Sequence, residues 1–160
     1  MKATIIIPTY NERDNIGKLV EEILALDLNL ELEIVIVDDN SPDGTGEIAD
    51  ELGRRYSCVH TIHRLGKLGL GTAYIAGFKY ALREGSDLIL TMDADFSHDP
   101  KYIPDLISKA GEYHLAIGSR YIEDGGTRNW GIARKIISRT ANLFAKALLG
   151  FENNDCTAGF

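Results

Sequence analysis

Apolar and polar positions follow two alternating periods along the chain. Short apolar runs rich in β-branched residues, typical of buried parallel strands, are followed by longer segments in which apolar residues recur at helical spacing. The strands are expected at 4–7, 33–37, 59–63, 88–92 and 115–118, and the helices at 15–26, 45–55, 72–83, 100–110 and 132–149. This alternation predicts an α/β fold with a mostly parallel sheet and helices on its faces.

Length and composition limit the possibilities. The 160 residues, 44% of them hydrophobic, are enough for one core, so residues 1–160 are expected to form a single domain. The formal net charge of -7 argues against general nucleic-acid binding, and the two distant cysteines argue against a disulfide framework or a zinc site. Because no apolar run approaches the ~20 residues of a membrane span, the chain is expected to be soluble or peripheral.

Polar side chains cluster where the predicted strands end. Four strand ends carry the segments Pro8-Thr-Tyr-Asn-Glu12, Asp38-Asp39, Asp93-Ala-Asp95 and Ser119-Arg120. Ligands of open α/β sheets bind beyond the carboxyl ends of the strands. One rim of the sheet is therefore expected to present an aromatic ring, several carboxylates and an arginine to a ligand.

Among these residues, Asp93 and Asp95 give the most specific indication of a ligand site. They flank Ala94 directly after an apolar strand, so both carboxylates can face one ligand. Hard carboxylate oxygens suit Mg²⁺ or Mn²⁺ that is also held by substrate phosphates, where the cation neutralises a diphosphate leaving group. An isolated Asp-x-Asp is usually a solvated turn, but this one shares its rim with Tyr10 and Asp39, which favours the metal site.

Several other residues suit either a ligand or a purely structural role. Asp43 and Gly44 fit a turn beside a nucleoside, although turn chemistry alone explains them. Lys67 lies in a glycine-rich segment that matches neither the Walker loop nor the dinucleotide fingerprint, so a sugar-nucleotide contact and a plain loop remain equal alternatives. His98 suits a metal ligand as well as an exposed turn.

The charge reverses near the end of the chain. Residues 125–151 contain no acidic side chain and five basic ones. Apolar residues recur at helical spacing over 132–149, as in a basic amphipathic helix that lies on an anionic membrane surface. An ordinary core-facing helix with a solvated basic side has the same periodicity, so both interpretations stay open.

At these residues the sequence resembles the family 2 glycosyltransferases, and specifically the dolichyl-phosphate (polyprenyl-phosphate) mannosyltransferases. The shared motifs are Pro8-Thr-Tyr-Asn-Glu12, Asp38-Asp-Asn-Ser-Pro-Asp-Gly-Thr45, Lys67-Leu-Gly-Leu-Gly-Thr-Ala73, Met92-Asp-Ala-Asp-Phe-Ser-His98, Gly118-Ser-Arg-Tyr121 and Arg134-Lys-Ile-Ile-Ser-Arg139. They follow one another over nearly the whole chain, and several long motifs in order are far more specific than any one of them.

The resemblance implies a glycosyltransferase-A fold that transfers mannose from GDP-mannose to dolichyl or polyprenyl phosphate for protein glycosylation, with inversion to a β-linked product. The implied nucleotide-sugar contacts are Pro8, Tyr10, Glu12, Val37, Asp39, Asp93, Ala94, Asp95 and Arg120. Asp93 and Asp95 are the implied ligands of Mg²⁺ or Mn²⁺, with Asp95 the principal one. Asp95 and Arg120 are the implied catalytic residues, with Arg120 near the phosphates. Arg134 and Ser138 are expected near the acceptor phosphate.

The resemblance also implies further protein segments and a membrane next to this domain. Its last residues, Asp155-Cys-Thr-Ala-Gly-Phe160, are similar to the start of the family's Asp-x-Thr/Ser-Gly-Phe-Arg segment, so the domain is expected to be truncated before that Arg. A missing C-terminal segment or a membrane-anchor subunit is implied, with the domain peripheral on the cytoplasmic face of a membrane. Ser97 stands where some relatives carry a Gln that contacts the metal.

Other functions compete with this expectation. A family 2 transferase that uses UDP-glucose with the same lipid acceptor fits the residues as well, because sequence alone does not read the base or the sugar. A sugar nucleotidyltransferase normally has a Gly-rich, Arg-containing first turn, which Pro8 to Glu12 does not provide. An inactive nucleotide-binding fragment or subunit is the non-enzymatic alternative.

Overall fold

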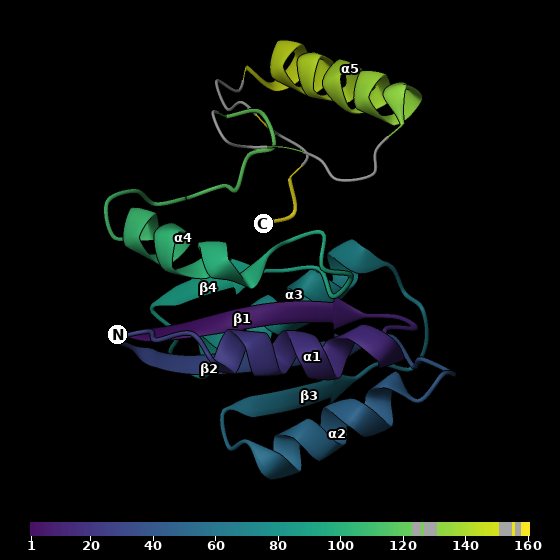
Figure 1. Cartoon of the computed structure of the whole chain (residues 1–160), viewed down its shortest axis with the longest axis vertical. Helices are drawn as coiled ribbons and strands as arrows, with labels where there is room; N and C mark the ends of the chain where they lie inside the picture. Colours follow the sequence, from purple (N-terminus) through teal and green to yellow (C-terminus); the bar gives the residue numbers. More distant parts are fainter. Residues whose placement is uncertain (123–125, 127–130, 151–154, 156–157) are drawn as a thin grey trace.

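The computed structural model describes residues 1–122, 126, 131–150, 155 and 158–160, with the backbone alone for 132–135 and 149. Its strands are β1 (Lys2–Thr9), β2 (Glu31–Asp38), β3 (Val59–His63) and β4 (Leu88–Thr91). Its helices are α1 (Arg13–Leu24), α2 (Thr45–Arg55), α3 (Leu70–Arg83), the 3-10 turn η1 (Pro100–Tyr102), α4 (Ile103–Ala110) and α5 (Ile132–Leu149) (Figure 1).

The four strands form one parallel sheet in the order β3-β2-β1-β4. The central strand β1 pairs with β2 over its whole length, from Lys2↔Glu31 to Thr9↔Asp38. It pairs with β4 only as far as Ile6. Parallel neighbours need crossover connections, which α1, α2 and α3 supply. The predicted mostly parallel sheet is confirmed.

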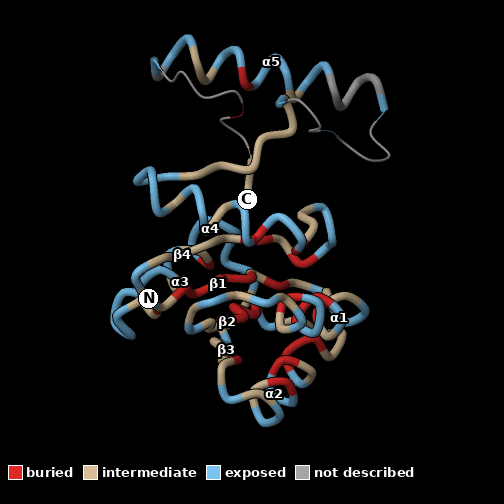
Figure 2. Tube along the Cα trace, turned by 60° about the vertical axis from the view of Figure 1, so that its left-hand side comes forward, coloured by how far each residue is buried: buried red, intermediate tan, exposed pale blue. Residues whose placement is uncertain are grey.

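Helices cover both faces of this sheet because successive strand residues point to opposite sides. On one face, fully buried Ile5 and Ile7 pack in a core with Leu19 of α1 and with residues of α2. On the other face, Ile6 packs with Ala73 of α3. Figure 1 shows α1 and α3 on opposite sides of β1, and Figure 2 shows the buried residues concentrated in the sheet and its inner helices.

Strand β1 continues through Pro8, although a proline usually ends a strand. The Met92 N–H donates to Ile6 O at 3.0 Å, so Ile6 faces β4. The backbone groups of residues two apart in a strand point toward the same neighbouring strand. The backbone of Pro8 therefore also points toward the β4 side, but beyond Thr91, the last residue of β4 that pairs with β1. The missing N–H of Pro8 consequently removes no bond from the ladder.

The fifth strand expected at 115–118 is wrong, since these residues take no part in the sheet. The Gly118 N–H donates instead to Phe160 O at 2.7 Å, and Leu115 is 71% exposed. A four-residue apolar run is typical of a strand, but here the Gly118 N–H forms its backbone hydrogen bond with Phe160 instead of with a neighbouring strand.

Helix α5 lies apart from the sheet, beyond α4 (Figure 1). Most of its described residues are exposed (Figure 2), including Ile137, Phe144 and Leu148. The described helices include none with both the length and the apolar character that a bilayer crossing requires.

The close approach of α3 to β1 depends on Gly77. A Cβ added there would lie well inside van der Waals contact with Ile6 Cγ2. We expect Gly77→Ala to lower the free energy of unfolding by about 2 kcal/mol, because the helix or Ile6 must shift. Urea unfolding followed by circular dichroism measures this change.

Gly17→Ala in α1 is the matched control, because a Cβ at Gly17 meets nothing within 4 Å. It is expected to stabilise the protein by up to ~1 kcal/mol, as alanine does in a helix interior. Equal effects of the two substitutions would contradict the packing role of Gly77.

Candidate active site

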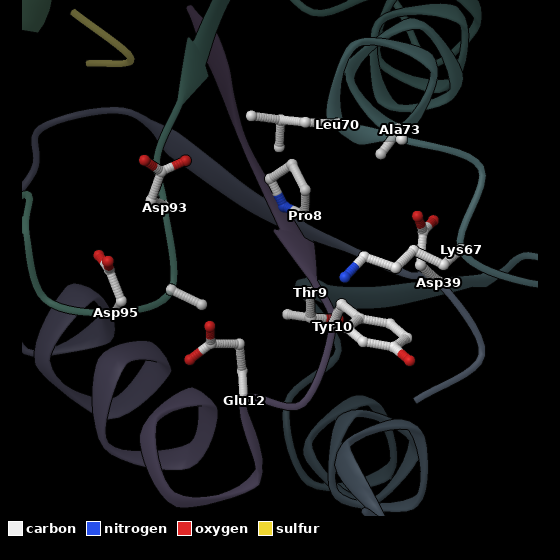
Figure 3. A pocket seen from close by; sticks show the side chains of 12 residues that line it. Pro8, Thr9, Tyr10, Glu12, Asp39, Lys67, Leu70, Ala73, Asp93 and Asp95 are labelled. Atoms are coloured by element: carbon white, nitrogen blue, oxygen red, sulfur yellow. The ribbon is translucent and has the colours of Figure 1, made fainter. Parts of the chain in front are cut away.

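A cavity of about 270 Å³ opens beyond the carboxyl ends of β1, β2 and β4 (Figure 3). It is lined by Pro8, Thr9, Tyr10, Glu12, Asp39, Lys67, Gly69, Leu70, Ala73, Asp93, Ala94 and Asp95. Seven of the residues predicted from the sequence are thus brought together: Pro8, Tyr10, Glu12, Asp39, Asp93, Ala94 and Asp95. The cavity lies at the edge of the sheet where open α/β folds bind ligands.

Buried Asp38 joins the ends of the two central strands below this cavity. Its side chain accepts hydrogen bonds from Thr9 Oγ1 at 2.9 Å and from Ser41 Oγ at 2.6 Å. It also accepts the Ser41 N–H at 3.0 Å, which holds the turn after β2. The register of β1 with β2 places Thr9 opposite Asp38, so the sheet itself brings these groups together.

Asp43 fixes the starts of α1 and α2. It accepts hydrogen bonds from the N–H and Oγ1 of Thr45 and from the N–H of Arg13. Desolvation by itself raises the pKa of Asp43, but these hydrogen bonds outweigh it and lower that pKa. Gly44, with φ of 95°, precedes α2. The structure therefore gives Asp43 and Gly44 a turn-forming role.

Asp39 lines the cavity from a buried position. Arg64 Nη1 lies 2.7 Å from Asp39 Oδ1 in an ion pair whose side chains are 9% and 7% exposed. The Leu68 N–H donates to Asp39 Oδ2 at 3.1 Å. Within the described residues, Oδ1 has this ion-pair contact but no hydrogen bond of normal geometry. This oxygen is buried against the Arg64 guanidinium, which satisfies its charge.

Tyr10 presents one face of its ring to Lys67. The Lys67 ammonium lies 4.0 Å from the centre of the Tyr10 ring, a cation–π contact. Figure 3 shows the Lys67 side chain reaching from the loop after β3 across the cavity toward Pro8 and Tyr10. Lys67 is the one cationic side chain among the residues that line this cavity.

The carboxylates of Asp93 and Asp95 lie on the opposite side of the cavity from Lys67 (Figure 3). Asp93 Oδ1 accepts a hydrogen bond from Tyr74 Oη at 3.0 Å. Burial, together with the charge of Asp93, raises the pKa of Tyr74 well above its usual range, so Tyr74 stays a hydrogen-bond donor. The Ser97 N–H donates to Asp95 Oδ1 at 2.9 Å. Burial opposes ionisation of Asp95, but the hydrogen bonds from Ser97 outweigh it and lower its pKa.

His98 braces the backbone of the Asp-x-Asp turn. Its Nδ1 accepts the Asp93 N–H at 3.1 Å, and its Nε2 lies 3.9 Å from Asp93 Oδ2. Burial lowers the pKa of His98, which favours a neutral ring, and the hydrogen bond to Nδ1 assigns the proton to Nε2. A protonated Nε2 offers no lone pair, so His98 acts here as a structural residue.

Asp93 and Asp95 offer carboxylate oxygens to a divalent cation. Two carboxylates face one cavity, and each keeps an oxygen that no other described side chain takes up in a hydrogen bond. The described residues contain no cluster of three or more His, Cys, Asp or Glu side chains suited to a metal. Two hard oxygen ligands fit Mg²⁺ or Mn²⁺ when phosphate oxygens and water complete the shell.

Arg120 lies outside the residues that line the cavity, paired with Asp155. Its Nε lies 2.6 Å from Asp155 Oδ2, and its Nη2 2.7 Å from Oδ1, a bidentate geometry. After burial, its positive charge also contributes to the lowered pKa of His98. Phe160 stacks on His98 with ring centres 4.9 Å apart. These contacts tie residues 118–120 and the last residues to the Asp-x-Asp turn.

The remaining predicted residues lie away from the cavity lining. Val37 is fully buried on the α3 face of the sheet, so only its backbone can reach the rim. Ser138 accepts a hydrogen bond from Tyr121 Oη at 2.8 Å. Arg134 belongs to α5, but its side chain lies outside the described part of the structure.

Sequence reasoning missed several contributors on or near α3. Leu70 and Ala73 line the cavity, and Tyr74 bonds Asp93, because α3 begins at Leu70. The predicted start at 72 left Leu70 out of the helix, and the pattern gave no ligand role to Ala73 or Tyr74 inside it. Arg64 directly follows β3, so the same strand-end rule that selected Asp39 could have selected Arg64 as well.

Comparison with known proteins agrees with this geometry. A family described as Glycosyl transferase family 2 matches residues 4–160. The chain belongs to this family. The predicted family is thus confirmed over nearly the whole sequence.

Two curated relatives cover the chain almost completely. "Polyprenol monophosphomannose synthase" of Mycolicibacterium smegmatis is 45% identical over 99% of this chain and 60% of its own length. "Undecaprenyl-phosphate mannosyltransferase" of Micrococcus luteus is 41% identical over 100% of this chain and 65% of its own length. The chain therefore spans less than two thirds of either relative.

A solved structure supports the fold. Mannosyl-3-phosphoglycerate synthase from Rubrobacter xylanophilus superposes with a TM-score of 0.66 and 25% identity, over 94% of this chain and 50% of that one. The expected glycosyltransferase-A fold is confirmed.

The buried Arg120–Asp155 pair makes stability depend on pH. Burial by itself raises the pKa of Asp155, but hydrogen bonds from Arg120 and Asn142 outweigh it and hold that pKa well below its usual range. A depressed folded-state pKa stabilises the fold above the unfolded pKa of about 3.9, and this contribution is lost as the pH falls below it. We expect Asp155→Asn to cost about 2 kcal/mol at pH 7 and to flatten the loss of stability on acidification.

Urea midpoints between pH 7 and pH 3 measure this effect, with exposed Asp27→Asn as the control. A variant at Asp155 with the wild-type pH dependence would show that the pair does not contribute to acid sensitivity.

Proposed function

We propose that this chain is the donor-binding domain of an inverting transferase that moves mannose from GDP-mannose to a polyprenyl phosphate such as dolichyl phosphate. The main support is the 45% identity with the protein named polyprenol monophosphomannose synthase, over essentially the whole chain. The cavity supplies the chemistry that this donor requires. The lipid-linked mannose would serve protein glycosylation.

The nucleoside end of the donor is assigned to Tyr10 and Asp39. An aromatic ring at a cavity rim offers a stacking surface to a base. The carboxylate of Asp39, which lines the cavity, would accept a hydrogen bond from a guanine N–H or a ribose hydroxyl. Pro8 and Glu12 complete this end of the cavity, and Val37 contributes backbone only.

The diphosphate and the sugar are assigned to Asp93, Ala94 and Asp95. Without a cation these carboxylates repel a diphosphate, so a bound Mg²⁺ or Mn²⁺ would neutralise the charge that develops on the leaving group. Asp95 would be the principal ligand and Asp93 the second. Tyr74 holds Asp93 in place from α3 through its hydrogen bond.

The acceptor end is assigned to Arg120, Arg134 and Ser138. A phosphate oxygen of the lipid attacks the anomeric carbon while the bond from that carbon to the GDP oxygen breaks, and GDP leaves with the electron pair. The acceptor is already ionised at neutral pH, so no general base is needed and orientation dominates. Arg120, held by Asp155, would stabilise charge on the phosphates.

Helix α5 is assigned to the membrane surface on the cytoplasmic side. Exposed apolar side chains such as Ile137 and Phe144 share this helix with basic Arg139 and Lys146. Such a helix inserts its apolar face at the headgroup boundary and attracts anionic lipids. A further C-terminal segment or a membrane-anchor subunit would complete the acceptor site.

The proposal is tested by calorimetric titration of the 160-residue chain with GDP-mannose, UDP-glucose and NAD, each with and without Mn²⁺. Binding of GDP-mannose that requires Mn²⁺ is expected, with little affinity for the other two. Preference for UDP-glucose would reassign the donor. Metal-independent binding of NAD would exclude the transferase.

Asp95→Ala is expected to abolish the Mn²⁺-dependent part of GDP-mannose binding and to leave the thermal unfolding midpoint unchanged within about 2 °C. An exposed rim carboxylate contributes little to the core, whereas the metal loses its principal ligand. Asp27→Ala, an exposed acidic residue outside the cavity, is the control. Unchanged metal-dependent affinity would remove Asp95 from the site.

Replacing Arg139 and Lys146 together with Gln is expected to weaken binding to vesicles that contain phosphatidylserine by about thirtyfold, at roughly 1 kcal/mol per basic residue. Vesicle co-sedimentation measures this. Lys18→Gln with Arg54→Gln carries the same charge change away from α5 and should leave binding unchanged. Equal loss in both double variants would show that α5 is not the membrane contact.

A further inference from the structure

The charges that line the cavity are unbalanced. Four carboxylates line it, those of Glu12, Asp39, Asp93 and Asp95, and Lys67 is the single cation among them. Asp39 is already paired with Arg64, which lies behind the cavity wall. Two further carboxylates suit a metal. Lys67 is therefore the one lining residue that can pair with an anionic group of a ligand.

Lys67 forms no ion pair with any carboxylate in the described part of the chain. Its ammonium instead lies 4.0 Å from the centre of the Tyr10 ring. A cation–π contact at an exposed position is worth only about 0.5–1 kcal/mol, so the ammonium is held weakly. It stays available to a stronger anionic partner.

The loop that carries Lys67 is held at both ends. Arg64 Nη1 donates to Gly69 O at 3.4 Å, and Arg64 Nη2 donates to Thr72 Oγ1. Asp39 binds the same loop through the Leu68 N–H. Because these anchors flank Lys67, its backbone is fixed while its four-carbon side chain is free to turn.

A stacked base and the Lys67 ammonium compete for the same face of Tyr10. A base that stacks there displaces the ammonium from the ring, and the fixed loop keeps it over the cavity. A diphosphate placed between the base and the carboxylates of Asp93 and Asp95 would then offer the ammonium an anionic partner. The side opposite these carboxylates otherwise offers no positive charge among the lining residues.

We infer that Lys67 is a donor-binding residue that covers Tyr10 in the free protein and pairs with the diphosphate of the nucleotide when the base takes its place. The Arg64–Asp39 pair is the positioning element that holds its loop. The exchange makes binding of the base and binding of the phosphates depend on one another. This inference rests on the proposed function for the identity of the donor, but not for the need for a diphosphate.

The test compares affinities for GDP and guanosine, and for UDP and uridine, in the wild-type chain and in Lys67→Met, by calorimetry with Mn²⁺ present. The variant is expected to bind the preferred diphosphate about fivefold more weakly, as for a partly exposed charge pair. Its affinity for the matching nucleoside should be unchanged or higher, because the competitor for Tyr10 has lost its charge.

Lys101→Met is the matched control. Lys101 also lies over a tyrosine, with its ammonium 4.8 Å from the ring centre of Tyr102, but it does not line the cavity. It should change neither affinity. Equal thermal unfolding midpoints of both variants and the wild type exclude a folding defect.

The possible results distinguish the role of Lys67 from the identity of the donor. Equal loss of affinity for nucleoside and diphosphate in Lys67→Met would overturn the inference, since Lys67 would then act on the base or the loop alone. A wild-type chain that prefers UDP overturns the proposed donor, and the UDP and uridine pair then decides the role of Lys67. A wild-type chain that binds neither GDP, UDP nor inorganic pyrophosphate overturns both.

Discussion

The hydrogen bonds accepted by buried Asp38 hold together the part of the molecule on which the site depends. The parallel register of β1 and β2 places Thr9 beside Asp38, and Asp38 in turn fixes the turn that follows β2. Each strand then delivers its next polar residues, Tyr10 and Asp39, to the same rim. A buried carboxylate is costly without partners, and here three donors satisfy it. The hydrophobic sheet sets the frame, and this polar cluster sets the positions at its edge.

The cavity is acidic although its proposed ligand is acidic too. Four carboxylates line it against one lysine, and the chain as a whole carries a formal charge of -7. Such a site binds a diphosphate only when cations accompany it or move to it. A divalent metal on one side and Lys67 on the other would enclose the diphosphate between two positive charges. Selectivity for the complete donor over a free nucleoside would follow from this arrangement.

The sequence predicted the core of the fold because its signals are local and repeated. The order of strands β1 to β4 and the faces of α1, α2 and α3 follow from periodicity, which burial enforces. Tyr10, Glu12, Asp39, Asp93 and Asp95 followed from one rule, that polar residues after parallel strands share a rim, whereas Pro8 and Ala94 came from the family resemblance. The expected strand at 115–118 was wrong because its backbone partner, Phe160, lies at the far end of the chain. No local pattern reports such a contact.

The same limit applies to the pairs that sequence reasoning missed. Arg64 with Asp39 and Tyr74 with Asp93 join residues that are distant along the chain. The strand-end rule selects Asp39 and Asp93 but does not say which residue pairs with either of them. The role of His98 could not be chosen from its neighbours, since the choice depends on which ring nitrogen accepts the Asp93 N–H. Residue type and spacing do not contain that information.

Three loops at the rim each contain a residue with positive φ, the left-handed backbone conformation that Gly44 also adopts. Asn11, Asn40 and Phe96 follow β1, β2 and β4 with φ of 60°, 56° and 58°, although none is a glycine. Asparagine tolerates this conformation, whereas a bulky phenylalanine adopts it at a cost of order 1–3 kcal/mol. The sheet and its polar anchors meet that cost when the chain folds. The rim is thus ordered before any ligand arrives, so little conformational entropy remains to be lost on binding.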